Sequence, residues 1–485
     1  MRVFLGLDLG TSGLRALLVD ETGATIGTSE AHYSVCHPHA GWSEQDPQHW
    51  LDAVATTVAT LRKNHPDAVA QLRGIGISGH MHGATLIDKK GAVLRPCILW
   101  NDSRSHAEAA LLDAVPQVRA LSGNIVFPGF TAPKCMWVAK HEPQVFALVA
   151  KVLLPKDYLS FWLTGRAVSE MSDAAGTSWL DVGARDWSDV LLNASGMRRD
   201  QMPDLVEGSQ IAGTVDDARA AELGLPKGVQ VVGGGGDNAA AACGVGALQE
   251  GQGFVSLGTS GVLLAARDSF VPMPASAVHT FCHAIPGTWY QMGVILAATD
   301  SLNWLSNILE TPAGDLASAV GDQIGGPQQL RFLPYLSGER TPHNDSTIRG
   351  AFLGLDISTD RAALVRSVME GVSFALRDSL EALKSTGAKL DRVLAIGGGA
   401  RSTYWVELMA TILNLPVDLP AQGEFGAALG AARLAICGVT GANPKEVMTQ
   451  PIVKKTIQPR QDVLADYEAA YQKFHASYPV LKQLL

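Results

Sequence analysis

The chain has 485 residues, of which 47% are hydrophobic and 18% charged, and a formal net charge of -9 at pH 7. This length and composition predict at least two domains with sizeable cores, and an acidic chain without a basic block argues against a nucleic-acid partner. The six cysteines are scattered without a CxxC pair, which predicts neither a zinc site nor a disulfide framework. With no signal-peptide layout and no apolar stretch long enough to span a bilayer, we expect a cytoplasmic protein without a membrane partner.

The N-terminal segment reads as a β-meander with a polar turn. Val3–Leu9 is an apolar run interrupted by Asp8, the turn Gly10–Gly13 contains Thr11 and Ser12, and Leu14–Val19 is apolar again. A turn of Gly, Thr and Ser can aim N–H and hydroxyl groups at a phosphate. A plain hairpin would use the same residues.

The turn recurs near the middle of the chain. Leu9–Gly13 is repeated letter for letter as Leu257–Gly261, at residue 257 against residue 9, an offset of 248. Both copies lie between two apolar runs, which predicts two similar α/β domains facing each other. Asp8 has Ser256 as its counterpart. Two phosphate-cradling turns with one carboxylate between them predict an asymmetric nucleotide cleft in which Asp8 serves a metal ion.

Two loops of the first half carry candidate ligand-binding residues. Met81 and His82 lie between glycines after the predicted strand at 72–78, in a loop position where function concentrates. A packed or solvated loop histidine is the alternative. Trp100, Asn101 and Asp102 combine a stacking face with an amide and a carboxylate, as a sugar site requires. A buried tryptophan followed by a helix capped by Asp102 remains equally open.

The glycine-rich stretch at 231–246 carries the candidate catalytic group. Val231 and Val232 predict the end of a buried strand, four glycines predict a turn of close backbone approach, and Asp237 opens a run of small residues typical of a helix. A carboxylate at a helix N-terminus is stabilised by the free N–H groups there. Asp237 is therefore a candidate catalytic carboxylate, with a simple N-cap aspartate as the alternative.

The second half follows without a Pro- or Ser-rich linker, so we expect the halves to share an interface and move as hinged bodies. Val393–Ile396 predicts a strand, Gly397–Ser402 a glycine-rich turn and Thr403–Leu413 a helix, an arrangement where a nucleotide can lie against backbone. The Walker A lysine pattern is absent. Apolar side chains recur along the tail, and this stripe indicates core packing or a dimer seam. Its members are Leu464, Tyr467, Tyr471, Phe474, Tyr478, Leu481 and Leu485.

Three other segments carry local signals. Asp46 before Pro47 predicts the capped start of a helix, Ser172–Thr177 predicts a polar turn, and Pro312–Gln329, which contains Gly and Asp, predicts a loop region.

Taken together, these motifs resemble the FGGY carbohydrate kinase family over nearly the whole chain. The resemblance rests on the following segments: Asp8–Gly13, Gly41–Pro47, Met81–Gly83, Trp100–Asp102, Gly234–Ala239, Leu257–Gly261, Tyr335–Pro342 and Ile396–Ser402. It implies an α/β fold of two actin-like, ribonuclease-H-type domains, residues 1–244 on the sugar side and 245–485 on the nucleotide side. ATP and sugar would bind in the cleft between them.

The resemblance also implies roles for individual residues. Asp237 would be the general base that accepts the proton of the attacking hydroxyl, remaining ionised at the helix N-terminus, and Asp8 would hold Mg²⁺. Met81, His82, Trp100 and Asn101 would contact the sugar together with Asp237. Thr11, Ser12, Gly258 and Thr259 would cradle the phosphates of ATP, and Gly398 and Gly399 would lie along the adenosine.

Within the family, the Met81–Gly83 and Trp100–Asp102 segments are most similar to kinases of D-xylulose. The implied reaction is ATP-dependent phosphorylation of D-xylulose at its primary 5-hydroxyl, in a possible homodimer. L-ribulose, L-xylulose or a pentitol are alternative acceptors. An actin- or Hsp70-like ATPase and a catalytically silent sugar sensor are alternatives from other classes. Thr403 departs from the asparagine that related glycerol kinases often carry, and Cys135 replaces a larger apolar residue.

Overall fold

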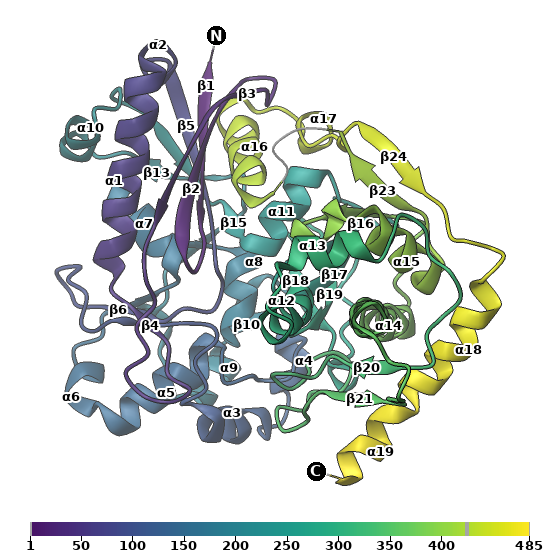
Figure 1. Ribbon diagram of the computed structural model, residues 1–485. Helices are drawn as coiled ribbons and strands as arrows, with labels where there is room; N and C mark the ends of the chain where they lie inside the picture. Colours follow the sequence, from purple (N-terminus) through teal and green to yellow (C-terminus); the bar gives the residue numbers. More distant parts are fainter. Residues whose placement is uncertain (1, 422–425, 485) are drawn as a thin grey trace.

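The computed structural model describes residues 2–421 and 426–484 and contains two mixed β-sheets, one in each half of the chain (Figure 1). The first sheet has the order β13-β14-β5-β1-β2-β3, with β15 also paired to β5. Its strands are β1 (Val3–Leu9), β2 (Gly13–Asp20), β3 (Thr25–His32), β5 (Leu72–Gly79), β13 (Ile211–Thr214), β14 (Gln230–Val232) and β15 (Gly235–Gly236). The predicted N-terminal meander is confirmed, because β1, β2 and β3 pair antiparallel in sequence.

The second sheet repeats this topology. Its order is β18-β19-β17-β16-β22-β23-β24. Its strands are β16 (Gly253–Leu257), β17 (Gly261–Arg267), β18 (His279–Cys282), β19 (Trp289–Ile295), β22 (Val393–Ile396), β23 (Val417–Pro420) and β24 (Val453–Ile457). In the first sheet the antiparallel strands β3, β2 and β1 continue into the parallel strands β5 and β14 and the antiparallel edge strand β13. The second sheet repeats this order with β19, β17, β16, β22, β23 and β24, and it adds β18, which is antiparallel to β19, at the other edge. The prediction of two similar α/β domains is confirmed.

The repeated turn connects equivalent strands in both sheets, β1 to β2 and β16 to β17. The two hairpins differ in register, because Leu9 pairs with Leu14 whereas Leu257 pairs with Gly261. The second loop is therefore one residue shorter. The same five-residue sequence therefore forms loops of different length in the two sheets.

Helices cover the faces of both sheets (Figure 1). In the first half they are α1 (Pro47–Asn64), α2 (Pro66–Val69), α3 (His106–Asp113), α4 (Val118–Ser122), α5 (Thr131–His141), α6 (Pro143–Phe146), α7 (Pro155–Thr164), α8 (Met171–Ala174), α9 (Asp189–Ala194), α10 (Asp217–Leu223) and α11 (Asp237–Val245). In the second half they are α12 (Thr299–Ile308), α13 (Ala313–Ala319), α14 (Arg361–Ser385), α15 (Thr403–Leu413), α16 (Ala427–Thr440), α17 (Pro444–Val447), α18 (Leu464–His475) and α19 (Ser477–Leu484). Among the described residues, no helix combines the length and apolarity needed to cross a membrane.

Five short strand pairs complete the fold. They are β4 (Glu44–Gln45) with β7 (Cys97–Ile98), β6 (Thr85–Ile87) with β8 (Lys151–Leu153), β9 (Val168–Glu170) with β12 (Asp204–Val206), β10 (Leu180–Asp181) with β11 (Asp186–Trp187), and β20 (Arg331–Leu333) with β21 (Ala351–Leu353). Most belong to the insertion between β5 and β14. This insertion carries α3 to α9 and forms the lower left part of the molecule in Figure 1.

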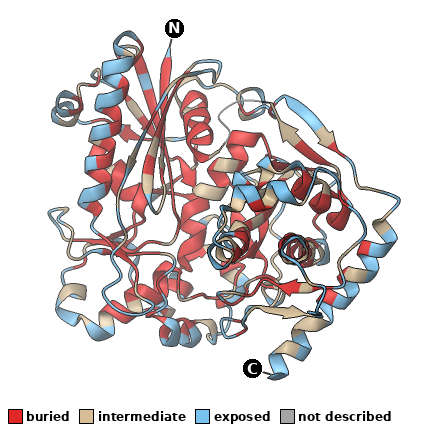
Figure 2. Ribbon diagram, in the orientation of Figure 1, coloured by how far each residue is buried: buried red, intermediate tan, exposed pale blue. Residues whose placement is uncertain are grey.

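Helix α16 comes late in the chain but packs on the first sheet. A Cβ on Gly6 of β1 would lie 1.9 Å from the Ala428 carbonyl oxygen, and a Cβ on Gly76 of β5 would lie 1.8 Å from that of Ala431. The helix also packs against α11, and Figure 2 shows it buried almost throughout. The division at residues 244 and 245 stays a prediction, and α16 is the segment of the second half that lies against the first sheet.

Several helix expectations are confirmed and two loops are corrected. Helix α15 spans the predicted Thr403–Leu413. Tyr467, Tyr471 and Phe474 of the tail stripe lie in the core, which confirms core packing, while Leu485 lies outside the described residues. Residues 172–177, expected as a polar turn, are buried and helical, and the expected loop at 312–329 contains α13.

Candidate functional site

Asp237 stands at the first position of α11, delivered by the glycine-rich turn that follows β14. Gly234 has φ +77°, and a Cβ there would lie 1.9 Å from the Ile77 carbonyl oxygen, so this position requires glycine. The N–H of Gly236 donates to Ser172 Oγ at 3.0 Å, which fixes the last residue of the turn. The sequence therefore places this carboxylate by close backbone packing against β5.

The Asp237 carboxylate is buried beside the N-terminus of α11. Gly236, not Asp237, is the N-cap, and the carboxylate accepts hydrogen bonds from Asn238 N at 2.7 Å and Nδ2 at 2.9 Å. Burial, together with the negative charge of Asp8, raises the pKa of Asp237 to about 6 against the opposing effect of the Asn238 hydrogen bonds. This pKa is higher than a helix start alone suggests, because burial opposes the favourable effect of the free N–H groups, yet the group stays ionised at neutral pH as the sequence predicts. Above pH 6 the carboxylate still predominates.

Asp8 is the penultimate residue of β1 and lies near enough to Asp237 for their charges to interact. It lines a small cavity with Arg15 and the first residues of α16. Burial raises the pKa of Asp8 to about 6, against the opposing charge of Arg15. Among the described residues no group of three or more His, Cys, Asp or Glu forms a metal site. A single carboxylate nevertheless fits Mg²⁺, which proteins usually hold with one or two carboxylates, water and substrate phosphates.

A cavity of ≈ 140 Å³ between the two halves contains Asp237 and most of the predicted sugar-binding residues. Its lining residues are His80, Met81, His82, Trp100, Phe127, Gly129, Phe130, Asp237, Asn238, Ser260, Val262, Met292, Val294 and Arg340. Met81, His82, Trp100 and Asp237 are thus brought together. Asn101 is exposed and is not among the lining residues. We call this space the inter-lobe cavity.

The loop that contains Met81 and His82, which we call the sugar-side loop, is fixed in an unusual conformation. His82 has φ +71°, its Nδ1 lies 2.7 Å from the Gly176 carbonyl oxygen, and its ring stacks on Phe130 at 4.5 Å between centroids. Burial lowers the pKa of His82 to about 3, so the ring is neutral. A carbonyl oxygen only accepts, so Nδ1 carries the proton and Nε2 is left as an acceptor.

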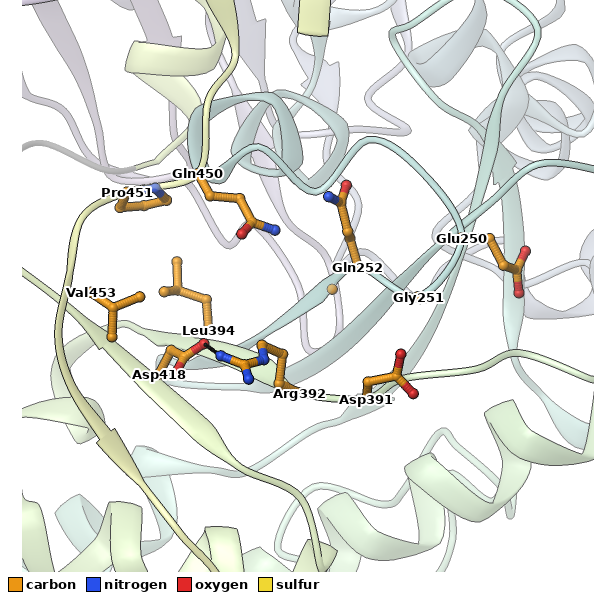
Figure 3. A pocket seen from close by; sticks show the side chains of 11 residues that line it. Glu250, Gly251, Gln252, Asp391, Arg392, Leu394, Asp418, Gln450, Pro451 and Val453 are labelled. Atoms are coloured by element: carbon orange, nitrogen blue, oxygen red, sulfur yellow. Dashed lines mark hydrogen bonds and ion pairs between the residues drawn. The ribbon is translucent and has the colours of Figure 1, made fainter.

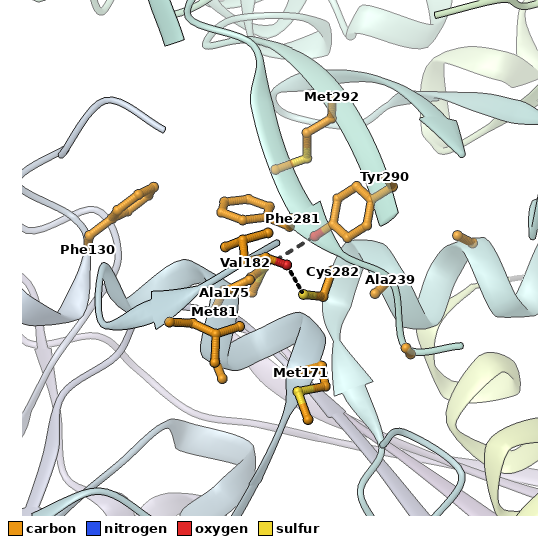
Figure 4. Close-up of a cluster of buried hydrophobic side chains, with 14 of the residues drawn as sticks. Met81, Phe130, Met171, Ala175, Val182, Ala239, Phe281, Cys282, Tyr290 and Met292 are labelled. Carbon is orange, nitrogen blue, oxygen red and sulfur yellow. Dashed lines mark hydrogen bonds between the residues drawn. The ribbon is translucent and has the colours of Figure 1, made fainter. Parts of the chain in front are cut away.

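An apolar wall, formed by residues of both halves, completes the inter-lobe cavity. Figure 4 shows Met81, Phe130 and Met292, which line the cavity, together with Phe281 and Tyr290, which do not line it but contact this lining. The Tyr290 hydroxyl lies 3.8 Å from Met81 Sδ, and the Phe130 and Phe281 rings are 6.2 Å apart. Such a wall suits the C–H face of a polyol.

Trp100, in the loop after β7, contacts the first phosphate turn, Gly10–Gly13; its counterpart Leu257–Gly261 is the second phosphate turn. Its indole Nε1 donates to Thr11 Oγ1 at 3.0 Å, and Gln45 Nε2 donates to the Thr11 carbonyl oxygen at 2.6 Å. Asp102 does not cap a helix: it accepts from Ser43 N at 2.6 Å and pairs with Arg104. The capped-helix alternative is therefore wrong.

The second phosphate turn directs its carbonyl groups into the protein. The Gly258 carbonyl accepts from Thr299 N and Oγ1 at 3.0 and 2.7 Å, and the Thr259 carbonyl accepts from Ala298 N at 2.8 Å. Ser12 and Thr259, at equivalent turns, are both exposed. These hydroxyls are accessible to an anion, as the phosphate-cradle prediction requires, whereas the Gly10 N–H of the first turn donates to the Gly13 carbonyl oxygen at 2.9 Å.

A larger cavity of ≈ 630 Å³ belongs to the second half and contains Gly398 and Gly399. Its wall is completed by Thr299 of α12, residues of α13 such as Ala317, and Thr403 of α15. Sequence reasoning missed the contribution of α13, since that segment reads as a glycine-containing loop. A volume of this size accommodates a nucleoside.

Another hollow, drawn in Figure 3, lies at the opposite ends of these strands. It includes Gly253, Leu394 and Asp418, which stand at or near the starts of β16 and β22 and in β23. It contains none of the predicted site residues. Ligands of open α/β sheets bind beyond the carboxyl ends of the strands, so we assign this hollow no part in the reaction.

Arg340 and Asn238 line the inter-lobe cavity and were missed as site residues. The Arg340 guanidinium lies over the Phe127 ring at 4.9 Å and forms no ion pair with a carboxylate among the described residues. Burial raises the pKa of its neighbour Glu339 to about 8, so that carboxyl is largely neutral at pH 7. A guanidinium from the second half therefore faces the cavity, with Glu339 as the carboxyl group whose charge acts on it. The sequence signal that could have identified Arg340 is the Gly338–Pro342 segment, in which Glu339 and Arg340 are adjacent charged residues.

Comparison with known proteins agrees with this arrangement. The chain matches the FGGY family of carbohydrate kinases, N-terminal domain, over residues 3–244 and C-terminal domain over residues 253–439. It is 45% identical over 487 residues to a xylulose kinase of Escherichia coli strain K12, covering 100% of this chain and 99% of that protein. A crystal structure of a xyloylose kinase from Brucella ovis has 55% identity and a TM-score of 0.98, with full coverage of both chains. A xylulose kinase structure from Rhodospirillum rubrum has 30% identity and a TM-score of 0.91, covering 100% and 99% of the two chains. The chain belongs to the FGGY family of carbohydrate kinases.

Proposed function

We propose that this kinase transfers the γ-phosphoryl group of ATP to the primary 5-hydroxyl of D-xylulose. The observation that carries the proposal is the shared cavity: the buried Asp237 carboxylate lines one small space with Met81, His82 and Trp100, where the two halves meet. The names of the relatives favour xylulose over other ketoses. Reaction in the cytoplasm of a xylose-degrading cell accords with this activity.

Asp237 is the general base of the proposed mechanism. As the 5-hydroxyl oxygen attacks the γ-phosphorus, its proton passes to the Asp237 carboxylate, and the bond from phosphorus to the bridging oxygen of ADP breaks. Asn238 holds the carboxylate through two hydrogen bonds. A pKa of about 6 suits the group, because it is ionised at neutral pH yet basic enough to take a proton.

The remaining residues position the two substrates. His82 Nε2 accepts a hydrogen bond from a sugar hydroxyl, Met81 and Trp100 contact its C–H groups, and Arg340 donates to its oxygens from the second half. Thr11, Ser12, Gly258 and Thr259 bind the phosphates, while Gly398 and Gly399 contact the adenosine. Mg²⁺ held at Asp8 would neutralise phosphate charge. Asn101 enters this set only if its loop moves, since its side chain is exposed in this structure.

The decisive measurement is ADP release with Mg·ATP across a panel of ketoses and polyols, on wild type, Asp237→Asn and the surface control Asp217→Asn. Turnover on D-xylulose that falls about 100-fold or more in Asp237→Asn alone supports the proposal. Preference for L-ribulose, L-xylulose or a pentitol replaces the acceptor and keeps the mechanism. Sugar-independent ATP hydrolysis alone favours the actin- or Hsp70-like ATPase, and light scattering at the same concentrations tests the homodimer.

A further inference from the structure

Lys134, on the first turns of α5, is one of two lysines in the described part of the chain that are fully buried. Lys156 is the other, and its ammonium lies 2.6 Å from Asp157 Oδ1 and 3.6 Å from Glu170 Oε1. Lys134 has no exposed surface and no ion pair with a carboxylate among the described residues. The two buried lysines therefore differ in their surroundings: Lys156 is paired with carboxylates, and Lys134 is not.

The polar partner of Lys134 is a main-chain atom of the sugar-side loop. Lys134 Nζ donates to the His82 carbonyl oxygen at 2.9 Å, and Thr131 Oγ1 donates to the same oxygen at 3.0 Å. Both donors come from the beginning of α5, so the two lone pairs of one carbonyl are held by a single rigid element.

The carbonyl that they hold belongs to a residue in a sparsely populated conformation. A φ of +71° is uncommon for residues other than glycine, although histidine is enriched there with asparagine and aspartate, and it costs free energy that neighbouring contacts must offset. With the carbonyl fixed behind the loop, the His82 ring is directed against Phe130 and into the inter-lobe cavity. The two hydrogen bonds from Lys134 and Thr131, which we call the α5 clamp, therefore determine where His82 Nε2 lies.

Keeping a lysine at this position opposes folding, because an unpaired buried ammonium loses its hydration. Burial lowers the pKa of Lys134 to about 7, with Cys97, Asp102, Cys135 and Arg104 as the nearby titratable groups. Ammonium and amine both carry N–H donors, so the hydrogen bond to His82 survives in either state. An apolar side chain of similar length would fill the site at lower cost to stability.

We propose that Lys134 is a positioning residue of the sugar site, which together with Thr131 holds the His82 carbonyl so that the His82 ring presents its acceptor to the substrate. The proposal rests on the proposed function, since it concerns how that site recognises its sugar. In this proposal Thr131 is the second donor to the His82 carbonyl oxygen. Helix α5 positions the sugar site, whereas Asp237 takes part in the reaction itself.

The test is Lys134→Met, which keeps the length of the side chain and removes its donors, compared with Lys140→Met on the exposed side of the same helix. We expect kcat/KM for the accepted sugar to fall about 10- to 100-fold in Lys134→Met, mainly through KM, with KM for ATP unchanged. Its Tm should remain equal to wild type or rise, because a buried charge is removed. Lys140→Met removes an exposed ammonium that pairs with Glu108 at 3.4 Å, and it should leave kcat and both KM values unchanged.

Thr131→Val gives an independent measurement should Lys134→Met fold poorly. It removes the other donor to the same oxygen, so we expect a smaller increase in sugar KM, and a larger one in the double variant than in either single variant. An unchanged sugar KM in Lys134→Met, or a fall in Tm with equal losses for sugar and ATP, would overturn the proposal. Failure of wild type on D-xylulose concerns the proposed function instead, and the comparison is then made with the sugar that wild type accepts.

Discussion

Gly176 lies in the buried 3-10 helix at 175–177 and accepts a hydrogen bond from the sugar-side loop, with its carbonyl oxygen 2.7 Å from His82 Nδ1. A Cβ added at this position would lie 2.5 Å from His82 Nδ1, 2.6 Å from His82 Cε1 and 2.9 Å from Met81 Cε. The histidine ring cannot retreat freely, because it stacks on Phe130 at 4.5 Å. Gly176→Ala should therefore displace both predicted sugar contacts at once.

The magnitude follows from overpacking and from the hydrogen bond that Gly176 accepts. Overpacking a filled site costs about 1–3 kcal/mol, and a neutral hydrogen bond contributes about 0.5–1.5 kcal/mol. A loss of about 2 kcal/mol in sugar binding corresponds to about a 30-fold fall in kcat/KM. The backbone of Gly176 is not in the left-handed region, so alanine introduces no strain of its own.

The assay is steady-state ADP release at varied sugar, with ATP saturating. Gly326→Ala is the matched control, because a Cβ there meets no atom within 4 Å and its φ is compatible with alanine. We expect an increased sugar KM in Gly176→Ala and wild-type kinetics in the control. If Gly176→Ala binds sugar as wild type does, the loop is not held as described and the reasoning fails.

Three further predictions concern other parts of the site. Because Asp237 must be ionised to accept a proton and its pKa is about 6, kcat/KM should fall as the pH drops through 6; an acid limb near pH 4 would contradict the effect of burial. Arg340→Met should raise the sugar KM about tenfold with little change for ATP, since hydrogen bonds from a charged group contribute about 1.5–3 kcal/mol; an effect confined to ATP would place Arg340 elsewhere in the reaction. Gly430→Ala brings a Cβ to 1.7 Å from the Ala240 carbonyl oxygen and should reduce the free energy of unfolding by about 2 kcal/mol or more. Urea denaturation measures this change. An unchanged midpoint would mean that α11 and α16 move apart without a loss of stability, against the prediction.

Local patterns predicted the elements of this fold well, because they depend on neighbours in the chain. The apolar run of β1 and the cap and proline that begin α1 are examples, with Asp46 accepting from Gln48 N at 2.9 Å. Residues 172–177 were mistaken for a turn because their polar letters satisfy buried partners far away: Ser172 Oγ accepts from Gly236 N. Distance along the chain, and not residue type, concealed this contact.

The same reason explains the errors at the site. Asp102 precedes an alanine-rich helix and would cap it in isolation, but Arg104 and the Ser43 N–H compete for its carboxylate. Arg340 lies on a distant loop, and only tertiary packing brings it over Phe127. The raised pKa of Asp237 likewise depends on burial and on Asp8, neither of which the helix start reveals. The roles of the individual site residues stay predictions until the variants are measured.

The placement of α16 has a consequence for how the protein is made. β1 and β5 present Gly6 and Gly76 to a helix that begins at Ala427, so these two strands leave the ribosome some 350 residues or more before their cover. During synthesis the first sheet therefore waits with one apolar face uncovered, a state in which nascent chains aggregate or engage chaperones. The chain cannot complete its first lobe as an independent early unit. The first sheet and α11 therefore gain this cover only after residues 427–440 have been synthesised.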